Sequence, residues 1–415
     1  MWFKKAKIAN SLTRQLTENP DLPIKEVLEN PDLLQSIRNE AQELLDYFTQ
    51  KEEHLKELFD LALSDRLNDE SIDFRYNRNA SNVLSSVAKT FQKAVESSQI
   101  AINALNDFIK DENKKYNRNP VYSGHFQRII QSHLFATFGK FIDLIPDLKN
   151  FLIKNVDILG YKQLLVSLLV DFHECLNDPG IGLEIAKIVT SAPKEEVKLH
   201  AIQVFIDVMR DRPDCTFLFQ QEIFEKLLLF AASFGEANLL YYEIFNALKM
   251  ISRDHEDTGW LYQIKHKFVN QFPFKDQPEE VAYVAFPFFA SFALEKMLKS
   301  FFKDDAPTSF TLAVLEQIKK VPDEKLHDMI KVDDIINKIM ESGLAFPSDE
   351  NYHVRINSHI FKFGMFLIEK DLPPHIVDKP GWDLFICTKL LHREHLIKQC
   401  TGVVEKPESH VSDFF

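Results

Sequence analysis

The most regular hydrophobic pattern in the chain lies between residues 117 and 172, where apolar residues recur every three or four positions. Asn119-Pro120 precedes the pattern. Because proline lacks an N–H and disfavours helix just before it, a helix is predicted to begin there. One uninterrupted apolar stripe follows, as expected for a single helix face, and its members are Phe126, Ile129, Ile130, Leu134, Phe135, Phe138, Phe141, Ile142 and Ile145. Pro146 and Gly160 separate it from two further stripes. No stripe can bury itself, so the three are expected to pack together.

Similar stripes recur through the rest of the chain. The clearest follows Asn30-Pro31 and predicts one helix face, lined by Leu33, Leu34, Ile37, Ala41, Leu44, Leu45 and Phe48. Prolines and polar loops interrupt the stripes every few turns of helix, and each Asn-Pro pair favours a turn followed by a new helix. This spacing suits the helix pairs or triplets of HEAT and armadillo repeats, which run about 40–47 residues. The sequence therefore predicts an all-α fold, a HEAT/armadillo-like helical-repeat solenoid, although no motif recurs at a strict period.

Composition is consistent with such a fold. Hydrophobic residues make up 45% of the chain, and the 11 glycines are too few for a sheet protein with many tight turns. The 36 phenylalanines sit mostly inside the stripes, so core packing is their expected role. We expect residues 1–400 to form one helical-repeat domain and residues 401–415 to form a loosely ordered C-terminal tail.

Charge and cysteine usage narrow the class of protein. The net charge of −13 argues against nucleic acid as a partner, because phosphate binding needs clustered Lys and Arg. The four cysteines are isolated, which indicates neither a zinc ribbon nor a disulfide framework. The most apolar run, Val281 to Leu294, is too short to span a bilayer and carries Pro287, so a buried helix is predicted instead of membrane insertion. We expect a soluble, intracellular protein.

Residues that could carry chemistry are few. Gly180-Ile181-Gly182 lacks the third glycine and the preceding strand of a phosphate loop, and a plain helix start is expected. His392 and His395 lack the H-E-x-x-H spacing of a metalloprotease, and Asp254 to Asp257 lacks the EF-hand pattern. The metallophosphatase signatures G-D-x-x-D-R-G and G-N-H-E are also missing. We therefore expect no catalytic residue, no cofactor and no metal site, and an all-helical enzyme ranks last among the alternatives.

Three segments in order carry a family resemblance. The first spans Leu22 to Phe48 and contains an L-P-I-K-E-V-L start, then D-L-L-Q and L-L-D-Y-F. The second begins at Phe74-Arg75-Tyr76 and is similar to an F-[KR]-Y-P…A…LL pattern, with Asn77 in place of the proline. The third runs from Asn119 to Leu169 and is similar to N-P-x-x-A-x-[FY]-F…LL. Together they resemble the SAPS family, the regulatory subunits of protein phosphatase 6, over about residues 22–172.

The resemblance implies a non-catalytic subunit that binds a PP2A-type serine/threonine phosphatase catalytic subunit and directs it to substrates. It also implies a cytoplasmic protein that could enter the nucleus, with further regulatory or scaffold proteins as partners. The alternative is a general HEAT/armadillo-type interaction scaffold or transport adaptor unrelated to phosphatases, which explains the helices equally well.

The resemblance is sharpest at Phe74, Arg75, Tyr76, Asn119 and Pro120, which are the candidate partner-binding residues. They are expected at loop–helix junctions, where partner contacts often lie. A structural role is the competing interpretation: Phe74 and Tyr76 would fill gaps between helices, and Asn119-Pro120 would cap a helix.

Overall fold

The computed structural model describes residues 11–64, 75–111, 113–176, 178, 180–255, 259–272, 280–298, 308–322, 325, 340, 362–368, 380–392 and 394–395. Over these residues the chain is helical and contains no strand, which confirms the predicted all-α class. Within them, no helix combines the length and apolar composition needed to cross a bilayer. The predicted tail, 401–415, lies outside the described residues.

The chain divides into two compact units, residues 1–227 and 228–415, and the expectation of a single domain over 1–400 stays a prediction. Helices of the first unit are α1 (Ser11–Glu18), α2 (Ile24–Glu29), α3 (Leu33–Arg38), α4 (Gln42–Thr49), α5 (Glu52–Leu63), α6 (Arg75–Leu84), α7 (Lys89–Ser97), α8 (Gln99–Ile109), α9 (Pro120–Thr137), η1 (Lys140–Leu144), α10 (Leu148–Lys154), α11 (Leu159–Asp171), α12 (His173–Leu176), α13 (Ile181–Ser191) and α14 (Glu195–Asp211). Helix α15 (Gln221–Ala231) spans the division. Those of the second unit are α16 (Leu239–Ser252), α17 (Gly259–Phe268), η2 (Val269–Gln271), α18 (Glu280–Met297), α19 (Thr308–Ile318), α24 (Trp382–Phe385) and the π-helix η4 (Ile386–Leu391).

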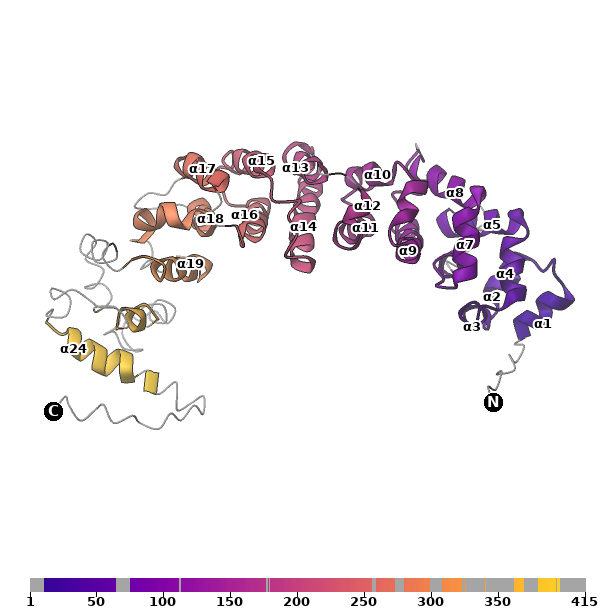
Figure 1. Ribbon diagram of the computed structural model, residues 1–415, viewed down its shortest axis with the longest axis horizontal. Coiled ribbons are helices and arrows are strands. Elements are labelled where there is room, and N and C mark those ends of the chain that lie inside the picture. Colours follow the sequence, from indigo (N-terminus) through magenta and orange to yellow (C-terminus); the bar gives the residue numbers. More distant parts are fainter. Residues whose placement is uncertain are drawn as a thin grey trace. The chain divides into compact units, whose positions relative to one another are not determined.

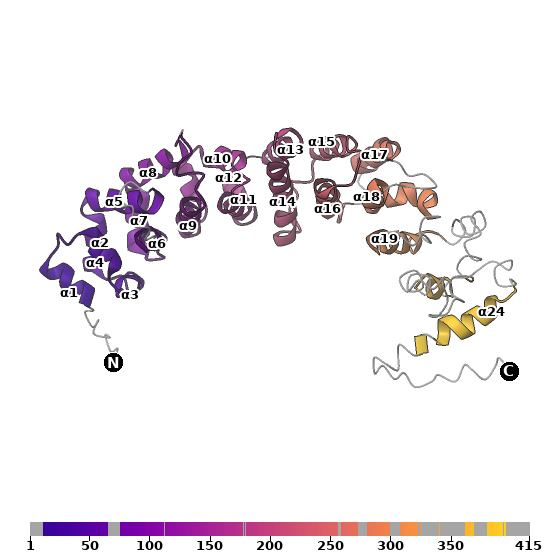
Figure 2. The same cartoon turned by 180° about the vertical axis from the view of Figure 1, so that it is seen from behind.

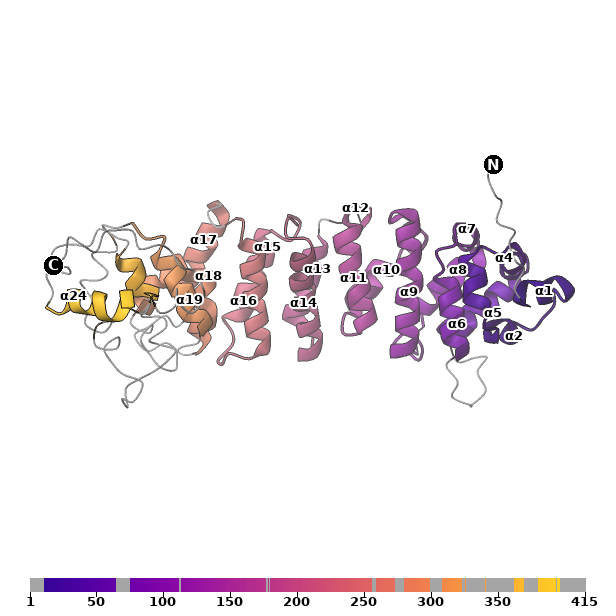
Figure 3. The same cartoon turned by 90° about the horizontal axis from the view of Figure 1, so that it is seen from below.

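Helices of the first unit pack mainly on their neighbours along the chain. Helices α9, α11 and α14 lie side by side, α11 packing on both of the others (Figures 1 and 3). Helix α10 covers α11, and α13 covers α14, from the opposite layer (Figure 1). Further toward the N-terminus, α5 packs on α6 and α8, and α6 lies beside α9 (Figure 2). The apolar stripes read from the sequence become the surfaces between these packed helices.

Two predicted helix faces are interrupted in the structure, so the prediction of continuous helices there was wrong. The stripe from Leu33 to Phe48 is divided between α3 and α4, because Glu40 adopts a left-handed conformation with φ of 51°. The Ala41 N–H then bonds the Ser36 carbonyl at 2.9 Å, a bond that closes the end of α3. The apolar spacing survives the break, and so the pattern alone could not reveal it.

The second interruption follows α9, which ends at Thr137 and not at Ile145. Phe138 and Gly139 both have positive φ, 54° and 88°, and the Gly139 N–H bonds the Leu134 carbonyl at 2.8 Å. A side chain at Gly139 would place its Cβ 2.5 Å from the Cys175 sulfur. Phe138 in this turn is exposed to 83% and Phe135 in the last turns of α9 to 52%, so these two residues leave the predicted buried stripe.

Side-chain donors join the helices of the first unit through backbone carbonyls. The imidazole nitrogen Nδ1 of His125 lies 2.9 Å from the Ala62 carbonyl, in the last turn of α5. Nε2 of His133 lies 3.2 Å from the Leu84 carbonyl, at the end of α6. A carbonyl only accepts, so each nitrogen carries the proton. The last carbonyls of a helix have no helical donor, and α9 supplies one to each of these two helices.

The second unit is held by aromatic side chains. Phe245 of α16 lies with its ring centroid 4.9 Å from Tyr241, 5.5 Å from Phe272 and 6.2 Å from both Phe288 and Phe289 of α18. The Tyr241 hydroxyl donates to the Val281 carbonyl at 2.8 Å. The segment from 281 to 294 is therefore a helix that packs into this cluster, as predicted, with Pro287 inside it.

Candidate binding groove

The predicted site residues around the start of α6 are only partly described, since Phe74 lies outside the described residues. Arg75 is exposed and opens α6, and Tyr76 is half-buried beside it. The Tyr76 hydroxyl donates to the Glu29 carboxylate, and the Lys25 ammonium lies 5.7 Å from the centre of the Tyr76 ring. Both partners belong to α2, so Tyr76 ties α6 to α2.

Asn119 and Pro120 form the N-terminal cap of α9. The Asn119 side chain accepts a hydrogen bond from the Val121 N–H at 2.8 Å, and Pro120 occupies the first helical position, where a missing N–H costs nothing. The competing capping interpretation is thus confirmed for this pair. Next to it, Arg118 pairs with Asp157 and donates to Asn155 at 3.0 Å. A role of these residues in partner binding stays a prediction.

The remaining sequence candidates have structural explanations where they are described. Gly182 lies in the first turn of α13, where an added Cβ would meet Ile223 at 2.8 Å, so the pair with Gly180 marks a helix start packed closely on its neighbour. His392 and His395 are exposed at the surface. No group of three or more potential metal ligands occurs among the described residues. Cys175, Cys215 and Cys387 are free thiols, and Cys400 lies outside the described part.

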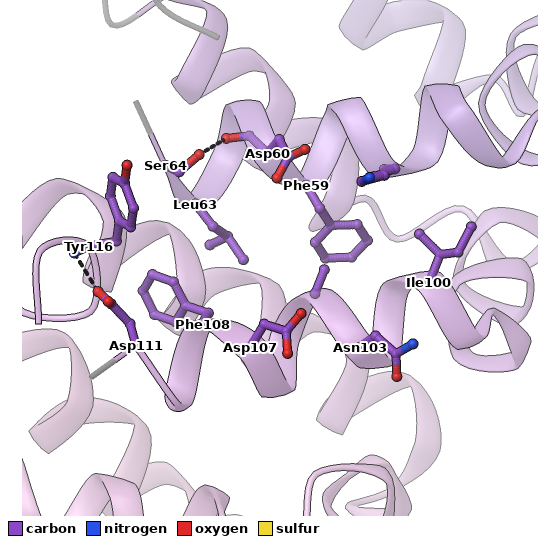
Figure 4. Close-up of a pocket in the computed structure, with 12 residues that line it drawn as sticks. Phe59, Asp60, Leu63, Ser64, Ile100, Asn103, Asp107, Phe108, Asp111 and Tyr116 are labelled. Carbon is purple, nitrogen blue, oxygen red and sulfur yellow. Dashed lines mark hydrogen bonds between the residues drawn. The ribbon is translucent and has the colours of Figure 1, made fainter. Parts of the chain in front are cut away.

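A groove between α5 and α8 is the candidate site that the structure adds (Figure 4). It encloses about 460 Å³, within the range of about 300–1,000 Å³ that ligand pockets occupy. The side chains along it come from α5, from α8 and from the turn after α8: Lys56, Phe59, Asp60, Leu63, Ser64, Ile100, Asn103, Ala104, Asp107, Phe108, Asp111 and Tyr116.

The floor of the groove is apolar. Phe59 and Leu63 lie four residues apart on α5, and Ala104 and Phe108 lie four apart on α8, so each pair shares one face of its helix. In Figure 4 the Phe59 and Phe108 rings lie between the two helices. Phe59, Leu63 and Phe108 are buried, while Ala104 is half-buried and contributes the accessible part of the floor.

The rim of the groove is acidic. Asp60 stands on α5, Asp107 on α8 and Asp111 just beyond it, and Lys56 is the one basic residue among the lining residues that the structure describes. Asp111 accepts a hydrogen bond from the Tyr116 N–H at 2.9 Å, which fixes the wall at that end. Asp107 is exposed to solvent. Carboxylates beside an apolar floor suit a ligand that carries both a positive charge and an apolar portion.

Sequence reasoning missed this groove because α5 and α8 are separated by two other helices in the chain. One signal was present: Asn103, Asp107 and Asp111 recur every four residues, a polar stripe on the exposed side of α8. Such a stripe normally indicates a solvated helix face. Only the packing of α5 against it converts that face into one wall of a groove.

A second groove, of about 540 Å³, crosses α9, α11 and α14, but its two basic side chains, Lys162 and Arg210, already pair with one carboxylate, that of Asp207. Lys162 contacts Asp207 at 3.2 Å, and Arg210 contacts the same carboxylate at 3.1 Å. A ligand would have to displace these ion pairs. The α5–α8 groove is therefore the better candidate.

One buried titratable pair lies outside both grooves. Nδ1 of His133 is 3.5 Å from Oε1 of Glu96 on α7, and neither atom has a hydrogen-bond partner. Burial lowers the pKa of His133 to about 4, against the opposing effect of the Leu84 carbonyl. Burial also raises the pKa of the Glu96 carboxyl, an effect that Lys93 opposes. His133 is therefore neutral at pH 7, and its hydrogen bond to the Leu84 carbonyl holds α9 against α6.

Comparison with known proteins adds no relative: no family model, no curated protein and no solved structure matches the chain.

Proposed function

We propose that this chain is a SAPS-like regulatory subunit, which binds a PP2A-type serine/threonine phosphatase catalytic subunit and directs it to substrates. The observation behind the proposal is the ordered resemblance of three segments, Leu22–Phe48, Phe74–Leu84 and Asn119–Leu169. In the proposal the hydrolytic chemistry and its metals belong to the partner, and the complex acts in the cytoplasm and the nucleus.

The proposed architecture is a HEAT/armadillo-like solenoid. Its support is the way in which α9, α11 and α14 form one layer of the first unit while α10 and α13 form the other. Solenoids of this kind present long surfaces to folded partners. The resembling segments correspond to α2–α4, α6 and α9–α11, all within the first unit, so the proposed phosphatase contact lies there.

The test is affinity capture of the tagged full chain from its own cells, with mass spectrometry of the bound proteins. A stoichiometric PP2A-type catalytic subunit is the expected result. Recovery of cargo or cytoskeletal proteins without a phosphatase would overturn the proposal in favour of a general scaffold or transport adaptor.

A matched pair of variants sharpens the same experiment. Arg75→Glu reverses an exposed charge in the first turn of α6, where an acidic side chain suits the helix dipole, and its circular dichroism and thermal unfolding are compared with those of the wild type. Arg78→Glu makes the same change one turn later, also at an exposed position. We expect Arg75→Glu to lose at least about 70% of the captured phosphatase, since one charged contact is worth about 1 kcal/mol or more. Equal capture by the two variants would remove Arg75 from the proposed interface.

A further inference from the structure

We propose that the α5–α8 groove is a peptide-binding site, and that its ligand is an extended segment of a partner protein in which an arginine has apolar neighbours. The inference does not depend on the phosphatase proposal, because it rests on the geometry of the groove alone.

The acidic rim indicates that the ligand carries positive charge. Asp60 and Asp107 flank the floor from opposite helices, and Asp111 closes one end, against a single lysine among the described lining residues (Figure 4). A ligand must therefore bring positive charge to gain from the rim. A second copy of this chain fits poorly, since the net charge of −13 makes two copies repel.

The length of the groove matches that of a short extended peptide. The lining on α8 runs from Ile100 to Phe108, and eight helical steps at about 1.5 Å each span about 12 Å. An extended chain advances about 3.3 Å per residue, so three or four residues match the groove. The central residue can point its side chain at the acidic rim, and the flanking residues can cover Ile100 and Ala104, both of which are half-buried.

The chemistry favours arginine over lysine. A guanidinium is planar, forms bidentate hydrogen bonds with carboxylates and stacks on aromatic rings. The acidic end of the groove offers both kinds of group: Asp107 and Asp111 lie four residues apart in the chain, and the Tyr116 ring stands beside Asp111 in Figure 4. The Lys115 ammonium already lies 4.8 Å from the centre of that ring, so a guanidinium would stack on the other face. A lysine ammonium could use the carboxylates, but it lacks the planar fork that forms two parallel hydrogen bonds with a carboxylate.

The wall at this end is held in place before any ligand arrives. The Asn117 side-chain amide donates to the Phe108, Ile109 and Asp111 carbonyls at 3.2–3.5 Å, and the Tyr161 hydroxyl donates to the Asn117 carbonyl. A rigid wall lowers the entropic cost of binding. The groove is therefore preorganised around the position of the arginine.

The test is fluorescence polarisation with the full chain and labelled peptides that differ only at the centre. The probe carries Leu-Arg-Leu between Gly-Ser flanks; matched probes carry Leu-Lys-Leu, Leu-Glu-Leu and Ser-Arg-Ser. We expect the Leu-Arg-Leu probe to bind at least about tenfold more tightly than Leu-Glu-Leu, and more tightly than the other two. Equal affinity for the arginine and glutamate probes would overturn the proposal.

Two variants locate the binding. Asp107→Asn removes one exposed carboxylate and should weaken the arginine probe about tenfold, whereas Asp143→Asn, the same change at an exposed position on η1, should leave it unaltered. Ala104→Arg places the chain's own guanidinium over the floor and should abolish binding. Unchanged affinity in Asp107→Asn and Ala104→Arg, with their helical circular dichroism intact, would show that the probe binds elsewhere and would also overturn the proposal.

Discussion

The two units of this chain use the same two kinds of contact, side-chain donors to backbone carbonyls and aromatic packing, at different places. In the first unit, buried donors on one helix find backbone carbonyls on another, as with His125 and Ala62 or His133 and Leu84. In the second, the aromatic cluster around Phe245 fills the space between α16 and α18. A buried donor fixes one arrangement because the cost of leaving it unpaired is high, while ring contacts tolerate several orientations. Helix α9 of the first unit carries two such donors, and both proposals above concern this unit.

The largest expected effect is the loss of stability that Phe245→Ala causes in the second unit. Removing this ring from contact with four aromatic neighbours should destabilise the second unit by about 3–5 kcal/mol, because the cavity cannot close fully. Trp260 and Trp382 both belong to the second unit, so urea unfolding followed by tryptophan fluorescence reports on it. The Phe245→Leu variant keeps the apolar contact but loses the ring geometry and should cost only about 1–2 kcal/mol. Equal costs would show that burial alone matters there.

The buried histidine of the first unit provides a pH-dependent test. The pKa of His133 is about 4 in the folded chain and about 6.5 when unfolded, so the unfolded state takes up a proton that the folded state refuses. Stability is therefore lost as pH falls from about 7 toward 4. His133→Phe, whose ring can stack on Phe141 as the imidazole does at 4.8 Å, should remove about 2 kcal/mol of the loss between pH 7 and pH 4.5.

The measurement is urea unfolding by circular dichroism at pH 7 and pH 4.5 for the wild type and His133→Phe. Glu96 has the opposite effect on folding stability: because its pKa is raised in the folded chain, stability falls as pH increases. Glu96 is present in both proteins. The exposed His266 serves as the control, and the stability of His266→Phe should depend on pH as that of the wild type does. Parallel pH curves for His133→Phe and the wild type would contradict a neutral buried imidazole.

The smallest expected effect comes from a matched pair of tyrosine variants, one in each unit. Tyr161→Phe and Tyr241→Phe each remove one hydroxyl that donates to a backbone carbonyl, Asn117 in the first unit and Val281 in the second. Each loss should cost about 1–3 kcal/mol. We expect Tyr161→Phe to lie at the upper end, because Asn117 also holds three carbonyls of the α8 turn. Hydrogen exchange of the amides in α9 and α16 measures the two costs separately, and a larger cost for Tyr241→Phe would reverse the distinction between the units.

The sequence predicts the helical class because apolar spacing records which side of a helix is buried. It does not record whether the backbone hydrogen bonds continue, and so Glu40 and Phe138 interrupt helices while the stripes run on. Gly139 was a local signal for the second break, since glycine is favoured just after a helix. No comparable glycine marks the first.

The candidate groove could not be predicted from local sequence, because it depends on which distant helices pack together. Phe59 and Phe108 are ordinary stripe residues, and Asp60 and Asp107 are ordinary solvated carboxylates, until α5 and α8 lie side by side. Asn119 illustrates the opposite case, since its capping role follows from Asn-Pro alone and is observed. Local chemistry was predictable, and the pairing of distant helices was not.

The histidine contacts of α9 also have a consequence for folding. Ala62 and Leu84 lie in the final turns of α5 and α6, and their carbonyls are satisfied by side chains that arrive more than 45 residues later. Neither helix has a complete C-terminus until α9 has docked. A repeat array whose layers were independent could fray one layer at a time from its end. Here α5, α6 and α9 share terminal hydrogen bonds, so we expect these three helices to gain and lose structure together.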